Sequence, residues 1–319
     1  RAERPHLLHQ ARLEHRLGAA IDGGVQRLAR RLKHPQLVAV AGGNIAWVGT
    51  NADRTHLVGP DTRLVDCGGR TLIPGFVDAH MHFLALASSL LAVDCRPPAV
   101  SSIPQLQAAI RRRAEPVPRG TWVRATGYNE FYLRERRHPT RWDLDEAAPE
   151  HPVKLTHRSG HACVLNSLAL RLAHIHEETP EPSGALFERD LETGQLTGLL
   201  FGMERYLEGK VLPPLSRAEL ASGARLASRE CLSHGVTAVH DATDSNTVED
   251  WRTFSSLREE GALLPRLTMM LGVHALEPAA EQGLRHGSGD ARLRLGYAKV
   301  MLDETTGRLQ PPPQELASL

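Results

Sequence analysis

The strongest constraint on the fold is the regular alternation of helix-forming and strand-forming segments between residues 216 and 303. Ser216-Arg217-Ala218-Glu219 is a capping box, and small or apolar side chains then recur at helical spacing as far as Gly235. Short connections between such segments are typical of parallel βα units. The expected helices are 217–234, 247–260 and 276–286, and the expected strands are 236–241, 267–273 and 295–303.

An earlier strand, expected over residues 72–80, leads into two histidines, His80 and His82. Alternate side chains of a strand lie on the same face, so the two imidazoles point the same way. The pair follows an apolar run and therefore lies at the carboxyl end of the strand, where parallel α/β folds gather their chemistry. Imidazole nitrogen is a good zinc ligand, so the spacing predicts a metal site with Met81 packed behind it. Two histidines that only cap the strand end are the alternative.

Four strands of this kind are half of the eight that close a βα barrel. We therefore expect an α/β fold containing a partial TIM-type (β/α) barrel, about its first half, with a small β-sheet module before it and a large insertion after the first barrel strand. The expected divisions are a helical leader (1–36), the β-sheet module (37–71), the half barrel (72–83 and 216–319) and the insertion (84–215).

Composition favours small-molecule chemistry. Of 319 residues, 41% are apolar and 24% are charged, and the formal net charge is +1, which offers no attraction for nucleic acid or an acidic membrane surface. The longest apolar run, 83–93, is about half as long as a membrane-spanning helix. The four cysteines lie far apart in the sequence, as in proteins of a reducing cytoplasm. We expect a cytoplasmic protein with a small-molecule substrate and no nucleic-acid or membrane partner.

Several motifs resemble one family. Residues 72–82, LIPGFVDAHMH, are similar to the first barrel strand of the amidohydrolase superfamily. Residues 156–167 (THRSGHACVLNS), the turn 189–190 with 197–200 (TGLL), and 235–241 (GVTAVHD) resemble the YtcJ-like amidohydrolases, also called amidohydrolase 3. The resemblance runs from about residue 37 to the end. It implies an enzyme that hydrolyses carbon–nitrogen bonds other than peptide bonds, such as those of N-substituted amides, with metal-activated water.

The resemblance also implies roles for particular residues. His80 and His82 would hold a divalent metal, with zinc expected, as one or two ions. Lys299, at the end of the fourth strand, would be carbamylated and bridge the ions; pairing with Asp303 is its alternative role. The insertion would form a lid in which His157, His161 and Asn166 contact substrate, or serve only as turn and capping residues.

The superfamily completes its site with histidines from the fifth and sixth strands and a general base, an aspartate, from the eighth. None has a counterpart in this sequence, so we expect the base beyond Leu319, a natural start before Arg1, and no activity from this fragment alone. The open half barrel would then need its missing C-terminal half or a second copy to cover its edges. The alternatives are a deaminase or cyclic-amide hydrolase of the same superfamily, and a non-catalytic metal-binding or interaction protein.

Overall fold

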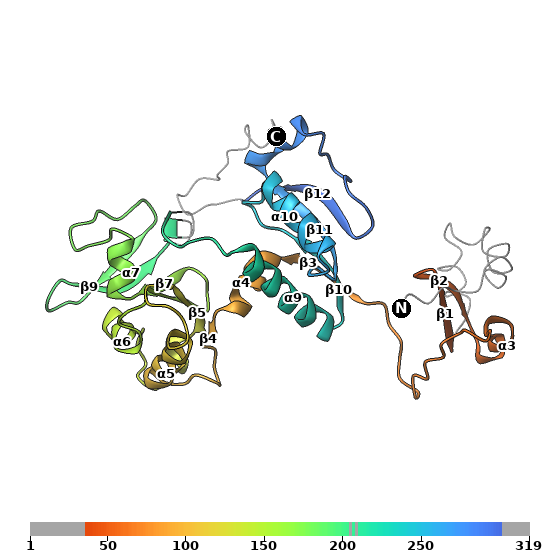
Figure 1. Cartoon of the computed structure of the whole chain (residues 1–319), viewed down its shortest axis with the longest axis horizontal. Helices are drawn as coiled ribbons and strands as arrows, with labels where there is room; N and C mark the ends of the chain where they lie inside the picture. The colour runs from red at the N-terminus through yellow and green to blue at the C-terminus, as the bar shows by residue number, and fades with distance from the viewer. Residues whose placement is uncertain (1–35, 204–205, 208–209, 302–319) are drawn as a thin grey trace. The chain divides into compact units, whose positions relative to one another are not determined.

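The structure is a computed structural model that describes residues 36–203, 206–207 and 210–301, coloured by position along the chain in Figure 1. It divides into two compact units, residues 1–73 and 74–319. Apart from Gln36, the leader expected over 1–36 lies outside the described residues, and so does Asp303.

The first unit contains one antiparallel hairpin, formed by β1 (Leu37–Ala41) and β2 (Asn44–Gly49). Its turn places Gly42 and Gly43 at φ +57° and +79°, values that glycine adopts without steric cost. A 3₁₀ turn, η1 (Asn51–Asp53), and a short helix, α3 (Arg54–Leu57), follow. Within the β-sheet module expected over 37–71, residues 63–66 form no strand, because this segment is exposed and pairs with no described strand.

The second unit contains a four-stranded parallel sheet in the order β12-β11-β10-β3. Since all four strands run the same way, their carboxyl ends meet at one edge of the sheet. The strands are β3 (Phe76–Met81), β10 (Val236–Asp241), β11 (Arg266–Gly272) and β12 (Leu293–Lys299). The fold is thus a mixed α/β fold with a parallel sheet, and no closed barrel is formed by the residues that the structure describes.

Helices cover one face of this sheet and bury its core. They are α4 (Phe83–Leu91), α9 (Arg217–Ser233), α10 (Val248–Glu259) and α11 (Leu276–Glu281), with the 3₁₀ turn η3 (Val273–Ala275) before α11. Phe83 and Phe254 pack with Val239, Met269 and neighbouring apolar side chains. α9 lies beside α4 (Figure 1), so close that a Cβ on Gly223 would come within 2.6 Å of the Ala87 carbonyl oxygen. A larger residue at position 223 would separate these helices.

The insertion is an organised α/β subdomain with its own six-stranded sheet, in the order β4-β5-β6-β7-β9-β8. Its first three strands are parallel, and the remaining pairs are antiparallel. The strands are β4 (Val93–Asp94), β5 (Val123–Tyr128), β6 (Val153–His157), β7 (Ala162–Leu165), β8 (Leu186–Arg189) and β9 (Leu196–Phe201). The helical segments are α5 (Ile103–Ala114), η2 (Glu130–Tyr132), α6 (Arg141–Ala147) and α7 (Ser167–Leu172).

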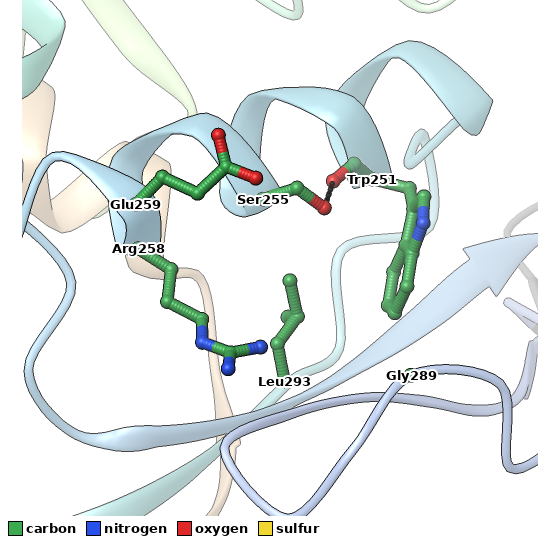
Figure 2. Close-up of a pocket in the computed structure, with 6 residues that line it drawn as sticks. All are labelled: Trp251, Ser255, Arg258, Glu259, Gly289 and Leu293. Carbon is green, nitrogen blue, oxygen red and sulfur yellow. Dashed lines mark hydrogen bonds between the residues drawn. The ribbon is translucent and has the colours of Figure 1, made fainter.

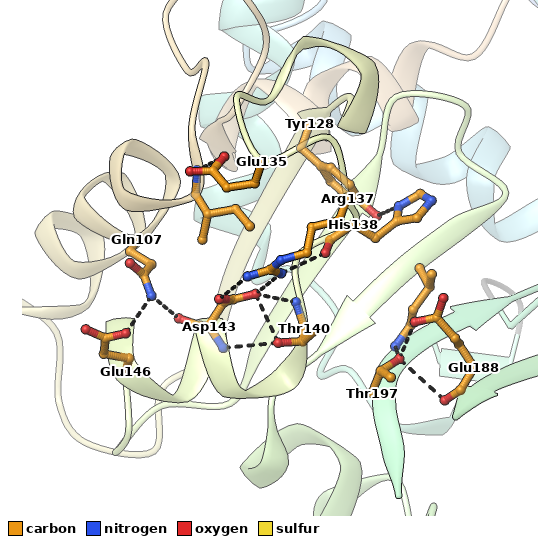
Figure 3. A network of polar contacts seen from close by, with 12 residues as sticks. Gln107, Tyr128, Glu135, Arg137, His138, Thr140, Asp143, Glu146, Glu188 and Thr197 are labelled. Atoms are coloured by element: carbon orange, nitrogen blue, oxygen red, sulfur yellow. Dashed lines mark hydrogen bonds and ion pairs between the residues drawn. The ribbon is translucent and has the colours of Figure 1, made fainter. Parts of the chain in front are cut away.

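Side-chain capping fixes the helices of the insertion. Thr140 and Asp143 form a reciprocal capping box at the start of α6, and Arg137 donates two hydrogen bonds to the Asp143 carboxylate at 2.7 and 3.1 Å (Figure 3). Arg137 holds the pKa of Asp143 below its usual range, in opposition to the effect of burial, which is the largest single influence and would raise it. Among the described helices, none is long and apolar enough to cross a membrane.

Candidate metal site

β3 delivers both predicted histidines to the carboxyl edge of the parallel sheet. The strand ends at Met81, and His82 is the N-cap of α4. The His80 and His82 rings lie 5.6 Å apart between centroids and stand nearly perpendicular, at 87°. Both side chains are exposed, while Met81 packs against the helix-covered core, as the alternation predicts. The two imidazoles are therefore close together and open to solvent.

Thr243, just after β10, holds the ring of His82. Its Oγ1 lies 2.9 Å from His82 Nδ1, which leaves Nε2 for another partner. His80 differs: its backbone N–H donates to Asp78 Oδ1 at 3.0 Å, but within the described part of the chain its imidazole has no hydrogen-bond partner.

Asp241, the last residue of β10, has a structural role. It is 1% exposed and accepts hydrogen bonds from Phe83 N at 2.7 Å, from Asn246 Nδ2 at 2.8 Å and from Thr243 N at 3.1 Å. A buried carboxylate with three donors is fully engaged, so Asp241 is not free to act as a ligand. Its neighbour His240 lies on the opposite side of the strand, in register with Thr268.

Lys299 is the last residue of β12 and lies in register with Gly272, at the same edge of the sheet as the histidines. Two strands separate β12 from β3, a span of about 14 Å across three strand spacings. No hydrogen bond joins Lys299 to either histidine among the described residues, so its role as a third ligand stays a prediction.

Two exposed imidazoles with a free Nε2 on His82 suit zinc, whose protein sites use three or four ligands. In the part of the chain that the structure describes, no group of three or more histidine, cysteine, aspartate or glutamate side chains is arranged to hold a metal. The described residues thus fit part of a metal site, and further ligands are needed to complete it.

His157 lies in a polar cluster within the insertion. Its Nε2 is 2.9 Å from Glu130 Oε2, and its Nδ1 is 2.8 Å from Ser159 Oγ. His138 approaches the other Glu130 oxygen at 3.9 Å, and its Nδ1 lies 3.0 Å from the hydroxyl of Tyr128 (Figure 3). Burial lowers the pKa of His157, an effect that the Glu130 carboxylate partly offsets. No motif in the sequence pointed to Glu130 or His138, which are 27 and 19 residues before His157.

His161 and Asn166 lie in different surroundings. His161 is exposed, and its backbone N–H donates to Ser159 Oγ at 3.2 Å. Asn166 is fully buried and caps α7: Oδ1 accepts from Ala169 N at 3.0 Å and from Val153 N at 2.9 Å. Its Nδ2 donates to two carbonyl oxygens. The capping alternative therefore describes Asn166, and its side chain has no free group for a substrate in this structure.

A cavity of about 450 Å³ lies away from the metal edge, between α10 and the chain around the start of β12. Figure 2 shows Trp251 and Arg258 of α10 facing Leu293, with Gly289 in the preceding loop. Leu293 begins β12, whereas Lys299 ends it, so the cavity is at the opposite end of the strand from the histidine edge.

The chain is similar in sequence and fold to known proteins. The sequence profile of the amidohydrolase family (amidohydrolase 3) matches residues 63–317. The N-substituted formamide deformylase of Arthrobacter pascens is 40% identical over 180 residues, which are 56% of this chain and 33% of that protein. YtcJ of Bacillus subtilis (strain 168), named as a proposed amidohydrolase, is 32% identical over 181 residues, 57% of this chain and 34% of that protein.

Among solved structures, an uncharacterized metal-dependent hydrolase from Pyrococcus furiosus superposes with a TM-score of 0.59 at 23% identity, over 81% of this chain and 50% of that one. This likeness shows a shared fold. The chain spans about a third of the length of the two curated relatives and half of that of the solved structure.

Proposed function

The chain belongs to the amidohydrolase family, and we propose that the protein is a metal-dependent hydrolase of carbon–nitrogen bonds other than peptide bonds. The observation that carries the proposal is the His80–His82 pair, exposed at the carboxyl edge of a parallel sheet with ring centroids 5.6 Å apart. Active sites of βα barrels lie at this edge. We further propose that the four-stranded sheet is the first half of such a barrel and that the insertion, 84–215, covers the substrate.

A bound divalent cation, zinc in this proposal, supplies a more acidic water and a polarised substrate carbonyl. His80 and His82 would hold it through imidazole nitrogens, with His82 binding through Nε2 because Nδ1 faces Thr243. Lys299, as a carbamate, would be a further ligand and would allow a second ion. The general base is assigned to none of the described residues.

We propose N-substituted amides, with formamides first among them, as substrates. The support is the name of the Arthrobacter pascens relative and its 40% identity. Within the insertion, we propose that the exposed His161 and the partly buried His157 contact the substrate, since each carries a polar ring on a loop or strand end. The spread of cysteines in the sequence supports a reducing cytoplasm as the location.

The first test is Zn²⁺ binding by the 319-residue chain, measured by calorimetry and by metal analysis after gel filtration. His80→Ala/His82→Ala should weaken binding at least tenfold, since both donors are removed. His56→Ala, which removes an exposed histidine from α3 of the other unit, is the matched control and should bind as the wild type does. Equal Zn²⁺ binding by the double variant would refute the site.

The second test concerns the reaction. Formate release from a panel of N-alkylformamides is expected of the longest reading frame containing this sequence, and it should be lost in the His80→Ala/His82→Ala variant of that protein. Ammonia release without formate would instead indicate a deaminase. Ring opening of a cyclic amide would indicate a cyclic-amide hydrolase. Stoichiometric Zn²⁺ binding with no turnover in the longest reading frame containing this sequence would support the non-catalytic alternative.

A further inference from the structure

We propose that Asp241 and Thr243 form a clamp that fixes the imidazole of His82 as an Nδ1–H donor and leaves the Nε2 lone pair for the metal. The proposal rests on the proposed metal-dependent function for the identity of the ligand bound at Nε2. The clamp itself is a feature of the protein without metal, so it can be tested separately.

The clamp is a closed circuit of hydrogen bonds between the ends of β3 and β10. His82 Nδ1 and Thr243 Oγ1 lie 2.9 Å apart. The backbone N–H of Phe83, the next residue, donates to Asp241 Oδ2 at 2.7 Å, and the backbone N–H of Thr243 donates to Asp241 Oδ1 at 3.1 Å. One carboxylate therefore fixes the chain after His82 and also the chain that carries the hydroxyl facing its ring.

Asn246 in turn holds the carboxylate of Asp241. Asn246 is 3% exposed, and its Nδ2 donates both to Asp241 Oδ1 at 2.8 Å and to the carbonyl oxygen of Met270, in β11, at 2.9 Å. The backbone N–H of Ala242 donates to the Met81 carbonyl at 2.8 Å. Buried, fully satisfied polar networks are rigid, because moving any member leaves another unpaired in a low dielectric. The clamp thus ties His82, at the end of β3, to the neighbouring strands β10 and β11.

His80, the other proposed ligand, has no such hydrogen bond to its ring within the described part of the chain. The imidazole of His80 is exposed, and no hydrogen bond to it is found among the described residues. Side chains that are already ordered lose less conformational entropy on binding. We infer that His82 is held ready to bind metal, whereas no hydrogen bond fixes the imidazole of His80 among the described residues.

The direction of the His82–Thr243 hydrogen bond decides whether the clamp leaves His82 Nε2 able to bind a metal. A threonine hydroxyl can donate or accept. If it donates to Nδ1, the ring proton moves to Nε2 and blocks the nitrogen that faces away from Thr243. If it accepts from Nδ1–H, Nε2 presents its lone pair, as in metal-binding histidines whose other nitrogen donates to a protein oxygen. The proposal requires the second arrangement in the protein without metal.

Two measurements on the 319-residue chain test the clamp. Two-bond ¹H–¹⁵N correlation spectra of the metal-free protein should show His82 as a single tautomer with the proton on Nδ1. In Thr243→Val, which keeps the shape and removes the hydroxyl, the ring should sample both tautomers, and Zn²⁺ affinity should fall 10- to 100-fold. Thr243→Ser should restore both readouts, because a hydroxyl returns to the same position.

Controls separate this role from general stability. Thr268→Val removes a partly buried hydroxyl from the middle of β11, and Zn²⁺ affinity and the His82 tautomer should not change. Thr243→Ala serves if Thr243→Val does not fold, because the backbone N–H to Asp241 remains in both. A wild-type His82 with the proton on Nε2, or a folded Thr243→Val that binds Zn²⁺ within twofold of the wild type, would overturn the clamp. A wild type that binds no Zn²⁺ while His82 keeps the Nδ1–H tautomer would overturn the proposed function and support the clamp.

Discussion

Replacing Asn166 with alanine should destabilise the insertion by about 3 to 7 kcal/mol, because its amide connects β6, the loop before it and α7. The side chain is fully buried and makes three hydrogen bonds of 3.0 Å or less, to Val153 N, Ala169 N and His151 O. A fourth, to the Ala148 carbonyl oxygen, is long at 3.4 Å. The same amide was predicted from the sequence as a substrate contact, so this variant tests the two roles against each other.

The magnitude follows from what alanine leaves behind. Loss of the cap on α7 costs about 1 kcal/mol. The Val153 N–H and the His151 carbonyl would be left unpaired beside it, at about 1 to 3 kcal/mol for each buried group without a partner. The 3.4 Å contact adds little, since hydrogen bonds weaken with length. A water molecule entering the space would reduce the loss toward the lower end of the range.

The assay is urea unfolding followed by intrinsic tryptophan fluorescence, to which Trp122 and Trp142 of the insertion contribute two of the four tryptophans. Hydrogen exchange of β6 and α7 is the measure specific to the insertion. Asn44→Ala, which removes an exposed amide at the start of β2, is the control and should cost less than about 0.5 kcal/mol. A loss below about 1 kcal/mol for Asn166→Ala, with unchanged hydrogen exchange, would refute the structural role.

Three further predictions concern the backbone and titration. Gly198→Ala should cost at least about 2 kcal/mol in urea unfolding, because φ is +90° and a Cβ would lie 2.4 Å from the Leu165 carbonyl oxygen. The pKa of Asp290 is lowered to about 2, chiefly by hydrogen bonds from the backbone N–H groups of Arg292 and Leu293. The stability that the ionised Asp290 gives the folded state should therefore be complete above about pH 4 and be lost as the pH falls toward about 2. NMR titration of Asp290 and unfolding curves of Asp290→Ala measure this. Since burial lowers the pKa of His157, the folded state binds fewer protons than the unfolded state, and stability should fall as pH drops through 6.5; His157→Gln should flatten that slope.

The parallel sheet and its helices were largely predictable, because each segment carries its own signals. The capping box and apolar periodicity predicted a helix over 217–234, and α9 spans Arg217–Ser233. The strand predicted at 236–241 is β10. The predicted strand ends differ from the observed ones where extended chain continues beyond the paired residues. The first strand begins at Phe76 and not at residue 72, and the last ends at Lys299 and not at residue 303.

The insertion gave weaker signals for a physical reason. β7 and β9 are almost wholly buried, so they lack the alternation of apolar and polar residues that marks a strand with one solvent face. β4 has only two residues. Residues 63–66 lie in the expected β-sheet module but form no strand, because no described strand pairs with them.

In the candidate site, too, the contacts within one strand could be predicted from the sequence, whereas contacts between distant residues could not. His80 and His82 come together through the geometry of one strand, so a spacing of two residues was enough to predict them. The Thr243 contact joins residues 161 apart, and no sequence pattern identifies which hydroxyl will face a ring across two strands. Glu130 and His138 were missed for the same reason, since they meet His157 only after β5 and β6 pair.

The role proposed for Lys299 is the most demanding case, because it depends on the curvature of the whole sheet. Two metal ions that share a bridging ligand lie about 3.5 to 4 Å apart, so their ligands must converge within a few ångströms. Three strand spacings separate β12 from β3, about 14 Å if the sheet is followed from strand to strand. Only strong curling, of the kind that closes a barrel, shortens that path across the interior. Lys299 would therefore become a partner of His80 and His82 only through the packing of every strand between them, whereas the two histidines are brought together by β3 alone.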